Sequence, residues 1–179
     1  MKGHSVAKGH SVAAFGLLIM SVLPASLPAK GPTDKITIEG AGLTTPLEIT
    51  DPAVRQFEVF DGPGVYVNRA EQREGFIIEC SKGIVAQPPS GLQHYKVSFY
   101  TKLEGERPGY EVIYVAFYDY DPSMKQGYIY LPGPRDESFK YQRIWHGHGF
   151  EGHWSYATSL WESFARPLIA KARAANPNH

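Results

Sequence analysis

Alternating apolar and polar positions predict three consecutive antiparallel strands between residues 95 and 132. A strand sends successive side chains to opposite faces of a sheet, so each alternating stretch defines two faces. Turn-forming residues separate the stretches at positions 104–109 and again at 121–127. The stretches themselves are Tyr95–Leu103, Tyr110–Tyr120 and Gly127–Leu131. We therefore expect a three-stranded meander in the middle of the chain.

The alternation gives this meander one aliphatic face and one tyrosine face. We assign the aliphatic and phenylalanine side chains to the core, namely Val97, Phe99, Leu103, Ile113, Val115, Phe117, Ile129 and Leu131. The opposite side then carries a candidate ligand-binding set, Tyr100, Tyr114, Tyr118, Tyr128 and Tyr130. Rings on a sheet form an amphipathic platform that can stack on sugars or peptides while the hydroxyls make polar contacts. The alternative is a structural role, in which this face packs beneath a helix.

Helical patterns flank the predicted strands. Asp51 and Pro52 suit an N-cap and a first helical position, so we expect a short helix over Pro52–Phe60. Near the C-terminus, a capping box precedes apolar residues at helical spacing, which are Leu160, Trp161, Phe164, Leu168 and Ala172. Pro167 within that amphipathic helix predicts a kink or a break. These elements together predict an α+β fold with an antiparallel sheet of five or more strands.

The first 29 residues have the layout of a secretory signal peptide. Lys2 and Lys8 precede the apolar run Val12–Leu23, and prolines and small residues follow it. The run is shorter than the roughly 20 residues that a membrane-spanning helix needs. Cleavage is expected after Ala25 or after Ala29, and the alternative is a leader retained as an anchor or a buried helix. We expect residues 30–179 to form a single secreted or periplasmic domain with no stable membrane span.

Charge and cysteine content narrow the classes of partner. The chain has 18 basic and 18 acidic residues, a net charge of zero, and no basic run. Binding to nucleic acid therefore has no electrostatic support. Cys80 is the single cysteine, which excludes an internal disulfide. Its alternation with Phe76 and Ile78 predicts a strand over Gly75–Cys80 and a buried, inert thiol.

A histidine-rich segment, WHGHGFEGHW at residues 145–154, is the candidate metal site. Its H-x-H pair would point both imidazoles to one face of a strand, and its glycines would let the chain turn back. The four candidate ligands of a zinc or similar ion are His146, His148, Glu151 and His153. No H-E-x-x-H motif is present, so adventitious binding by exposed histidines is the alternative. Neither a G-x-S-x-G motif nor a spaced carboxylate pair indicates another catalytic site.

Several stretches resemble a family of uncharacterised exported bacterial proteins. They are KVSFY, VAFYDYDP, QGYIYLPG and EGHWSYATSLWE followed by ARPLIAKAR, together with ITIEGAGL, PLEITDP and FEVFDGPGV nearer the N-terminus. The resemblance covers nearly all of the chain after the leader. Members of that family commonly have a segment with asparagine and arginine where this chain has Arg143–His148. The resemblance implies a single exported domain and brings no catalytic residue with it.

These patterns favour a non-catalytic binding or structural module of the cell envelope over an enzyme. A small molecule, a glycan or a protein is the kind of partner that the tyrosine set would suit. The competing hypothesis is a metal-dependent hydrolase that uses zinc held by the histidine cluster at residues 146–153.

Overall fold

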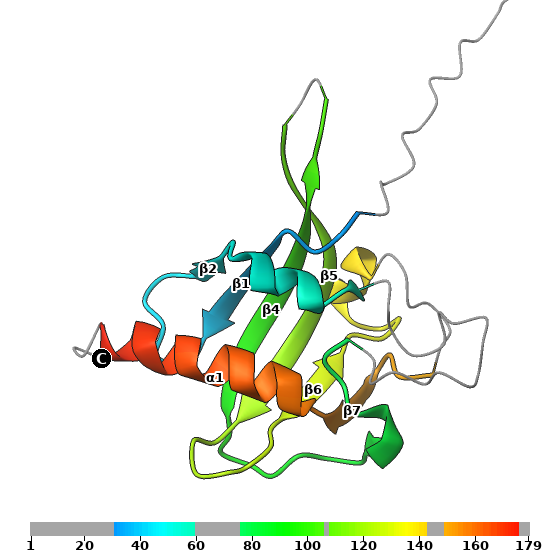
Figure 1. Cartoon of the computed structure of the whole chain (residues 1–179). Coiled ribbons are helices and arrows are strands. Elements are labelled where there is room, and N and C mark those ends of the chain that lie inside the picture. Colours follow the sequence, from blue (N-terminus) through cyan, green and yellow to red (C-terminus); the bar gives the residue numbers. More distant parts are fainter. Residues whose placement is uncertain (1–30, 60–75, 106–107, 143–148, 176–179) are drawn as a thin grey trace, which may run out of the picture.

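The structure is a computed structural model that describes residues 31–59, 76–105, 108–142 and 149–175. The predicted leader, residues 1–29, lies outside these ranges, as do His146 and His148. A twisted antiparallel sheet with one long C-terminal helix packed against it forms a mixed α+β fold (Figure 1).

The described part of the chain contains a seven-stranded sheet in the order β2-β1-β4-β5-β6-β7-β3. All neighbouring pairs are antiparallel. The strands are β1 (Lys35–Gly40), β2 (Leu47–Ile49), β3 (Ile84–Val85), β4 (Gln93–Leu103), β5 (Gly109–Tyr120), β6 (Tyr128–Leu131) and β7 (His153–Tyr156). The helices are α1 (Ser159–Ala174) and the 3-10 helices η1 (Pro52–Gln56), η3 (Cys80–Lys82) and η4 (Glu137–Tyr141).

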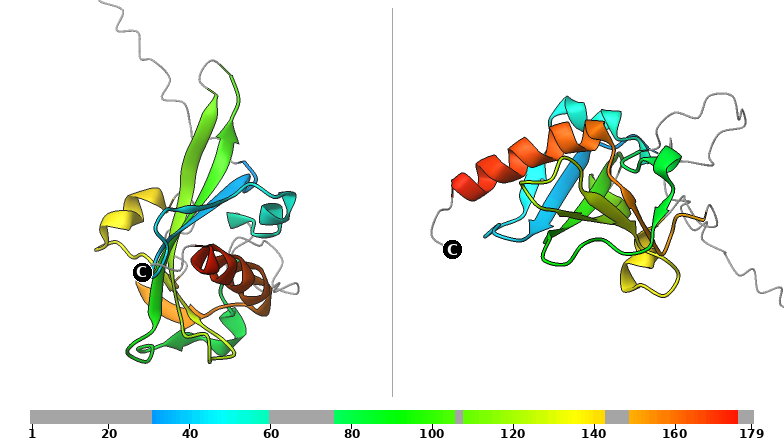
Figure 2. Two further views of the ribbon diagram at one scale, coloured as in Figure 1. Left: turned by 90° about the vertical axis from the view of Figure 1, so that its left-hand side faces the viewer. Right: turned by 90° about the horizontal axis from the view of Figure 1, so that it is seen from below.

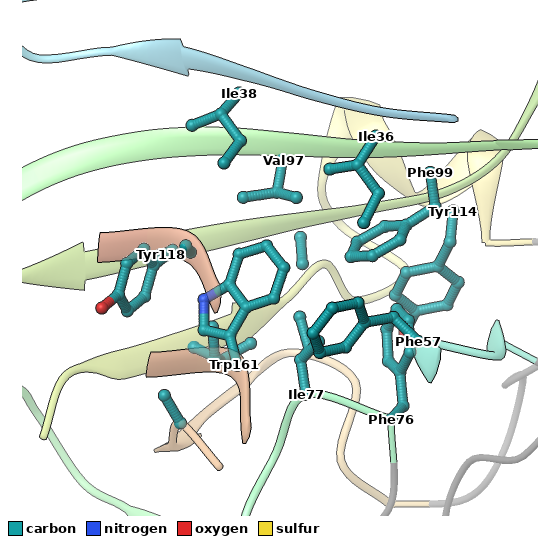
Figure 3. Close-up of a cluster of buried hydrophobic side chains, with 14 of the residues drawn as sticks. Ile36, Ile38, Phe57, Phe76, Ile77, Val97, Phe99, Tyr114, Tyr118 and Trp161 are labelled. Carbon is teal, nitrogen blue, oxygen red and sulfur yellow. The ribbon is translucent and has the colours of Figure 1, made fainter. Parts of the chain in front are cut away.

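Helix α1 lies across one face of the sheet, which we call the inner face, and η4 lies on the other side, the outer face (Figure 2). Trp161 of α1 is completely buried in the inner-face core (Figure 3). Its ring meets Phe57 edge-on at 5.3 Å between centroids and Tyr118 at 5.8 Å. Burial of such large rings is a major source of hydrophobic stabilisation, so α1 and the inner face form the core of the fold.

The register between β4 and β5 shows that the predicted aliphatic face is wrong for β5. Val97 lies opposite Ala116 and Phe99 lies opposite Tyr114, so the tyrosine side of β5 faces the core. Phe117 and Val115 consequently point to the outer side, where Phe117 is half-buried. Ile113 still joins the core because a register irregularity leaves it without an opposite residue on β4.

The predicted helix over residues 52–60 is instead the shorter 3-10 helix η1. Its start matches the prediction, because the Asp51 carboxylate accepts a hydrogen bond from the Ala53 N–H at 2.8 Å. Val54 and Phe57 are buried as expected. Phe57 leaves the helical path, with φ −103° and ψ 65°, and packs against Trp161. The turn therefore does not continue as an α-helix, and Phe60 lies outside the described residues.

Helix α1 is continuous through Pro167, so of the predicted kink or break, the break is wrong. Pro167 lies on the exposed side of the helix. The carbonyl that loses its backbone hydrogen bond there can bond to water instead. The N-cap is Thr158 rather than Ser159, and its hydroxyl accepts from the Trp161 N–H at 3.1 Å. The buried positions also differ from the prediction, because Leu160 is 44% exposed and Glu162 is buried.

The predicted strand over residues 75–80 is also wrong within its described part. Phe76 has a positive φ of 59°, which turns the backbone, and only Ile78 pairs, with Ala157 of the opposite segment. Cys80 begins η3 and is half-buried rather than buried. Its thiol donates to the carbonyl oxygen of Ile78 at 3.6 Å.

Candidate ligand-binding face

The five tyrosines of the predicted ligand-binding set do not share one surface. Tyr114 and Tyr118 lie on the inner face and are completely buried. Tyr118 lies opposite Ile129, so Tyr128 and Tyr130, the neighbours of Ile129 along β6, point to the outer side. Tyr100 also lies on the outer side, where its hydroxyl is 3.3 Å from that of Thr37. The idea of one five-tyrosine platform is therefore wrong, and the outer face keeps three of its members.

On the outer face, directly opposed residues of β5, β6 and β7 form two lines of rings, which we call the outer aromatic rows. The first row is Phe117, Tyr130 and Trp154, and the second is Tyr128 and Tyr156. Ring centroids are 6.3 Å apart for Phe117 and Tyr130, and 5.2 Å apart for Tyr130 and Trp154. Tyr128 is buried, whereas the other four rings are half-buried and present part of their surface to solvent.

A histidine and a carboxylate continue these rows onto β4 and β5. His94 lies opposite Asp119, and its Nδ1 is 2.6 Å from the Asp119 Oδ1. The exposed imidazole also stacks on Phe117 at 5.2 Å with an interplanar angle of 16°. Burial raises the pKa of the Asp119 carboxyl, although the hydrogen bond from His94 acts in the opposite direction. The pair places a polar group beside the first aromatic ring.

The loop after β6 anchors the central ring of the first row. The Tyr130 hydroxyl donates to the Asp136 Oδ2 at 2.7 Å, and the Gly133 N–H donates to the same oxygen at 2.7 Å. Burial and the Asp136 carboxylate raise the pKa of Tyr130 to about 12. Gly133 permits this arrangement, because a Cβ there would lie 2.7 Å from the Cα of Gly152. The Asp136 carboxylate, itself held by the Gly133 N–H, therefore fixes the orientation of Tyr130.

On the inner face, tyrosine hydroxyls are used to hold α1 in place. The Glu162 carboxylate accepts from the Tyr118 hydroxyl at 2.8 Å and from the Gly127 N–H at 2.7 Å. It also pairs with Arg166, whose Nε donates to the Tyr118 hydroxyl at 3.1 Å. Burial, followed by the nearby Glu162 charge, raises the pKa of Tyr118 well above its ordinary value. These contacts connect the helix to β5 and to the turn before β6, so we interpret them as structural.

A groove of about 480 Å³ lies at the start of α1 and adjoins the second aromatic row at Lys82, whose ammonium is 5.4 Å from the centre of the Tyr156 ring. Its lining residues are Lys82, Lys125, Gln126, Ser159, Glu162 and Ser163. Several of these groups already have hydrogen-bond partners in the protein, since Lys82 donates to Gln126 at 2.7 Å within the groove and Ser163 donates to the Leu160 carbonyl at 3.0 Å. The groove is polar and mostly self-satisfied, so we do not assign it a ligand.

The predicted zinc site is only partly within the described residues. His153 is exposed at the start of β7, and Glu151 is half-buried in the preceding turn. Burial and the nearby Glu151 carboxylate raise the pKa of Tyr114. Within the described ranges, no group of three His, Cys, Asp or Glu side chains is placed to hold a metal ion. Because His146 and His148 lie outside those ranges, the four-ligand site stays a prediction.

Sequence reasoning missed four members of the outer surface, namely His94, Phe117, Trp154 and Tyr156. The alternation of β5 places Phe117 in the core, and Trp154 closes the glycine-rich segment at residues 145–154. One signal was present, because Trp154 and Tyr156 alternate with Ser155, as expected for a strand with an aromatic side. Their grouping with Tyr130 and Tyr128 required the strand register.

In comparisons with known proteins, no family model, curated protein or solved structure matches the chain. Among the helices in the described ranges, none is both long and apolar enough to cross a bilayer. The outer aromatic rows are thus the candidate site on geometric grounds alone.

Proposed function

We propose that the protein is an exported, non-catalytic binding module of the cell envelope whose ligand lies on the outer aromatic rows. The observation that carries this proposal is the alignment of Phe117, Tyr130 and Trp154 as directly opposed, half-buried rings on the sheet face away from α1. Aromatic side chains combine a large apolar body with polar edges, which makes them frequent in binding surfaces.

The burial of the two faces supports a binding role for the outer one. Helix α1 covers the inner face, where Tyr118 and Trp161 are completely buried. The outer rings pack on one another and yet remain partly exposed to solvent. Clustered apolar surface of this kind is often retained for interaction with a partner.

Export is supported by the sequence of the first 29 residues and by the resemblance to exported bacterial proteins. Under this proposal the leader is removed after Ala25 or Ala29, and residues 30–179 act as a single domain outside the cytoplasm. A surface that recognises a polymer of the envelope would then meet its ligand directly.

The full chain is expressed and the exported protein is purified. The test measures its binding to a panel of polysaccharides, aromatic peptides and lipid vesicles. We expect at least one class to bind, and Trp154→Ala to weaken that binding by about tenfold or more, which corresponds to roughly 1.4 kcal/mol. The matched control is Tyr110→Ala, because Tyr110 is 45% exposed on β5 but lies outside the rows. Binding that both Trp154→Ala and Tyr130→Ala leave unchanged would contradict the proposal, as would a panel without any binder.

A further inference from the structure

Charged side chains of both signs border the outer aromatic rows. Lys96, opposite Phe117 in the first row, has its Nζ 4.0 Å from the Glu39 carboxylate. The Asp119 carboxylate, hydrogen-bonded to the His94 Nδ1, lies beside the second row. At the other end, the Lys82 ammonium lies 5.4 Å from the centre of the Tyr156 ring. A strongly charged ligand would meet both signs on this surface, so electrostatic complementarity favours a ligand without net charge.

The polar groups beside the rings can both donate and accept hydrogen bonds. The Nδ1 of His94 is bonded to Asp119, so Nε2 is the ring nitrogen left for a ligand. The Tyr130 hydroxyl donates a hydrogen bond to Asp136, and its oxygen can still accept another. A polyhydroxylated molecule suits such a surface, because its C–H faces pack on rings while its hydroxyls bond to neutral or paired polar groups.

The geometry of the first row fits a narrow, twisting ligand. Neighbouring strands lie about 4.8 Å apart, so the row from Phe117 to Trp154 covers roughly 10 Å, about the length of two linked sugar rings. The ring planes turn by 39° between Phe117 and Tyr130 and by 44° between Tyr130 and Trp154. Three rings turned in this way cannot all lie against one flat surface. They can each meet one part of a chain whose own units rotate along its length.

We infer that the outer aromatic rows bind a neutral glycan as a single extended chain that lies across β5, β6 and β7. Sugar faces pack against Phe117, Tyr130 and Trp154, and sugar hydroxyls bond to His94 and Asp119 at the side. This inference rests on the proposed function, since the same surface holds the ligand in both. It adds the ligand's chemical class and its direction across the strands. It also specifies that the ligand is a single chain and not the flat surface of a crystalline polysaccharide.

The test is isothermal titration calorimetry of the exported protein with neutral cello-, malto- and xylo-oligosaccharides, from disaccharide to hexasaccharide. Parallel assays use crystalline cellulose, an acidic polysaccharide, an aromatic peptide and neutral lipid vesicles. We expect at least one neutral oligosaccharide series to bind, with an affinity that rises with chain length until the row is covered. Trp154→Ala and Tyr130→Ala should each weaken binding by about tenfold or more, and Tyr110→Ala should leave it unchanged. Trp154→Leu, which keeps apolar bulk without a ring, replaces Trp154→Ala if the latter does not fold.

The outcomes separate the inference from the proposed function. If only the peptide or the vesicles bind, and binding depends on Trp154, the glycan is wrong while the binding face stands. Preference for the acidic polysaccharide would overturn the ligand class alone, and preference for crystalline cellulose would overturn the binding of a single extended chain. Oligosaccharide binding that is indifferent to Trp154 and Tyr130 would overturn both, because the glycan would then bind elsewhere. Absence of binding to every probe would also overturn both.

Discussion

On the inner face of the sheet, Tyr118 is completely buried, and its hydroxyl donates to Glu162 and accepts from Arg166. On the outer face, Tyr130 is half-buried, and its hydroxyl donates to Asp136 of the adjacent loop. The two residues stand on neighbouring strands and have the same chemistry. They differ in what covers them, since α1 closes the inner face and the outer rings remain partly open.

The comparison teaches that residue type alone does not identify a binding surface on a sheet. Tyrosine is accepted in the core when a partner is placed to satisfy its hydroxyl. Here the partners are the carboxylate and the guanidinium of α1, which is why a helix that looks amphipathic buries Glu162. The outer face has no helix of comparable length in the described residues, and four of its aromatic rings stay half-buried.

The largest difference should come from removing one tryptophan ring on each face. Trp161→Ala should lower the free energy of unfolding by about 3–5 kcal/mol, because it deletes a completely buried ring that contacts Phe57 and Tyr118. Trp154→Ala should cost about 1 kcal/mol or less, as expected for one partner of a cross-strand pair. Denaturant unfolding of the two variants measures the difference. Equal losses would show that the outer rows are as much a core as the inner face.

Removing the hydroxyl of Tyr118 or of Tyr130 should have a smaller effect on the free energy of unfolding, and the two effects should differ. Tyr118→Phe should lower the free energy of unfolding by about 1–3 kcal/mol, because Glu162 and Arg166 then lose a buried partner. The matched change, Tyr130→Phe, should cost about 1 kcal/mol or less, since Asp136 keeps its bond from the Gly133 N–H. Urea unfolding at neutral pH measures both. A larger loss for Tyr130→Phe would reverse the structural and binding roles assigned to these residues.

The smallest effect is a dependence of stability on alkaline pH. The pKa of Tyr95 is raised to about 12 in the folded protein, chiefly by burial, from an ordinary value of 10.0, and that of Tyr118 is raised as well. Between these values the folded state keeps protons that the unfolded state has released, so stability should be unchanged below about pH 9 and fall from about pH 10 to 12. Unfolding curves collected across this range measure the slope. The double variant Tyr95→Phe/Tyr118→Phe should flatten it, and an unchanged slope would place its origin elsewhere.

The sequence predicted the α+β class, the positions of β4, β5 and β6, and an amphipathic helix at the C-terminus. Those elements depend on local alternation and spacing, which a chain displays without its partners. The choice of the buried side of β5 depended instead on register. Both sides of that strand are largely apolar, since Val115 and Tyr114 are equally well buried in the fold. The local pattern favoured burial of the aliphatic side of β5. The pairing of Phe99 with Tyr114 instead places the tyrosine side in the core.

The candidate site was less predictable for the same reason. Tyr128 and Tyr130 were expected to face a ligand, and the structure places them on the outer side with Phe117 and Trp154. Trp154 lies more than twenty residues from Tyr130 in the chain, so only their pairing reveals that they are neighbours. The helix cap shows a related limit. Glu162 has the spacing of a capping box, yet its carboxylate bonds to Tyr118 and Gly127, which are distant in sequence.

Gln142 has a consequence for how copies of the protein meet in solution. Its side-chain amide accepts from the Val115 N–H at 2.9 Å and donates to the Val115 carbonyl at 2.6 Å, beyond the point where β5 and β6 pair. A bare strand edge invites a second chain to extend the sheet, which is a common start of aggregation. By satisfying both backbone groups, one glutamine blocks that edge as an added strand would. The fold thereby occupies the edge of the long central strand at Val115, the position where a second chain would otherwise pair.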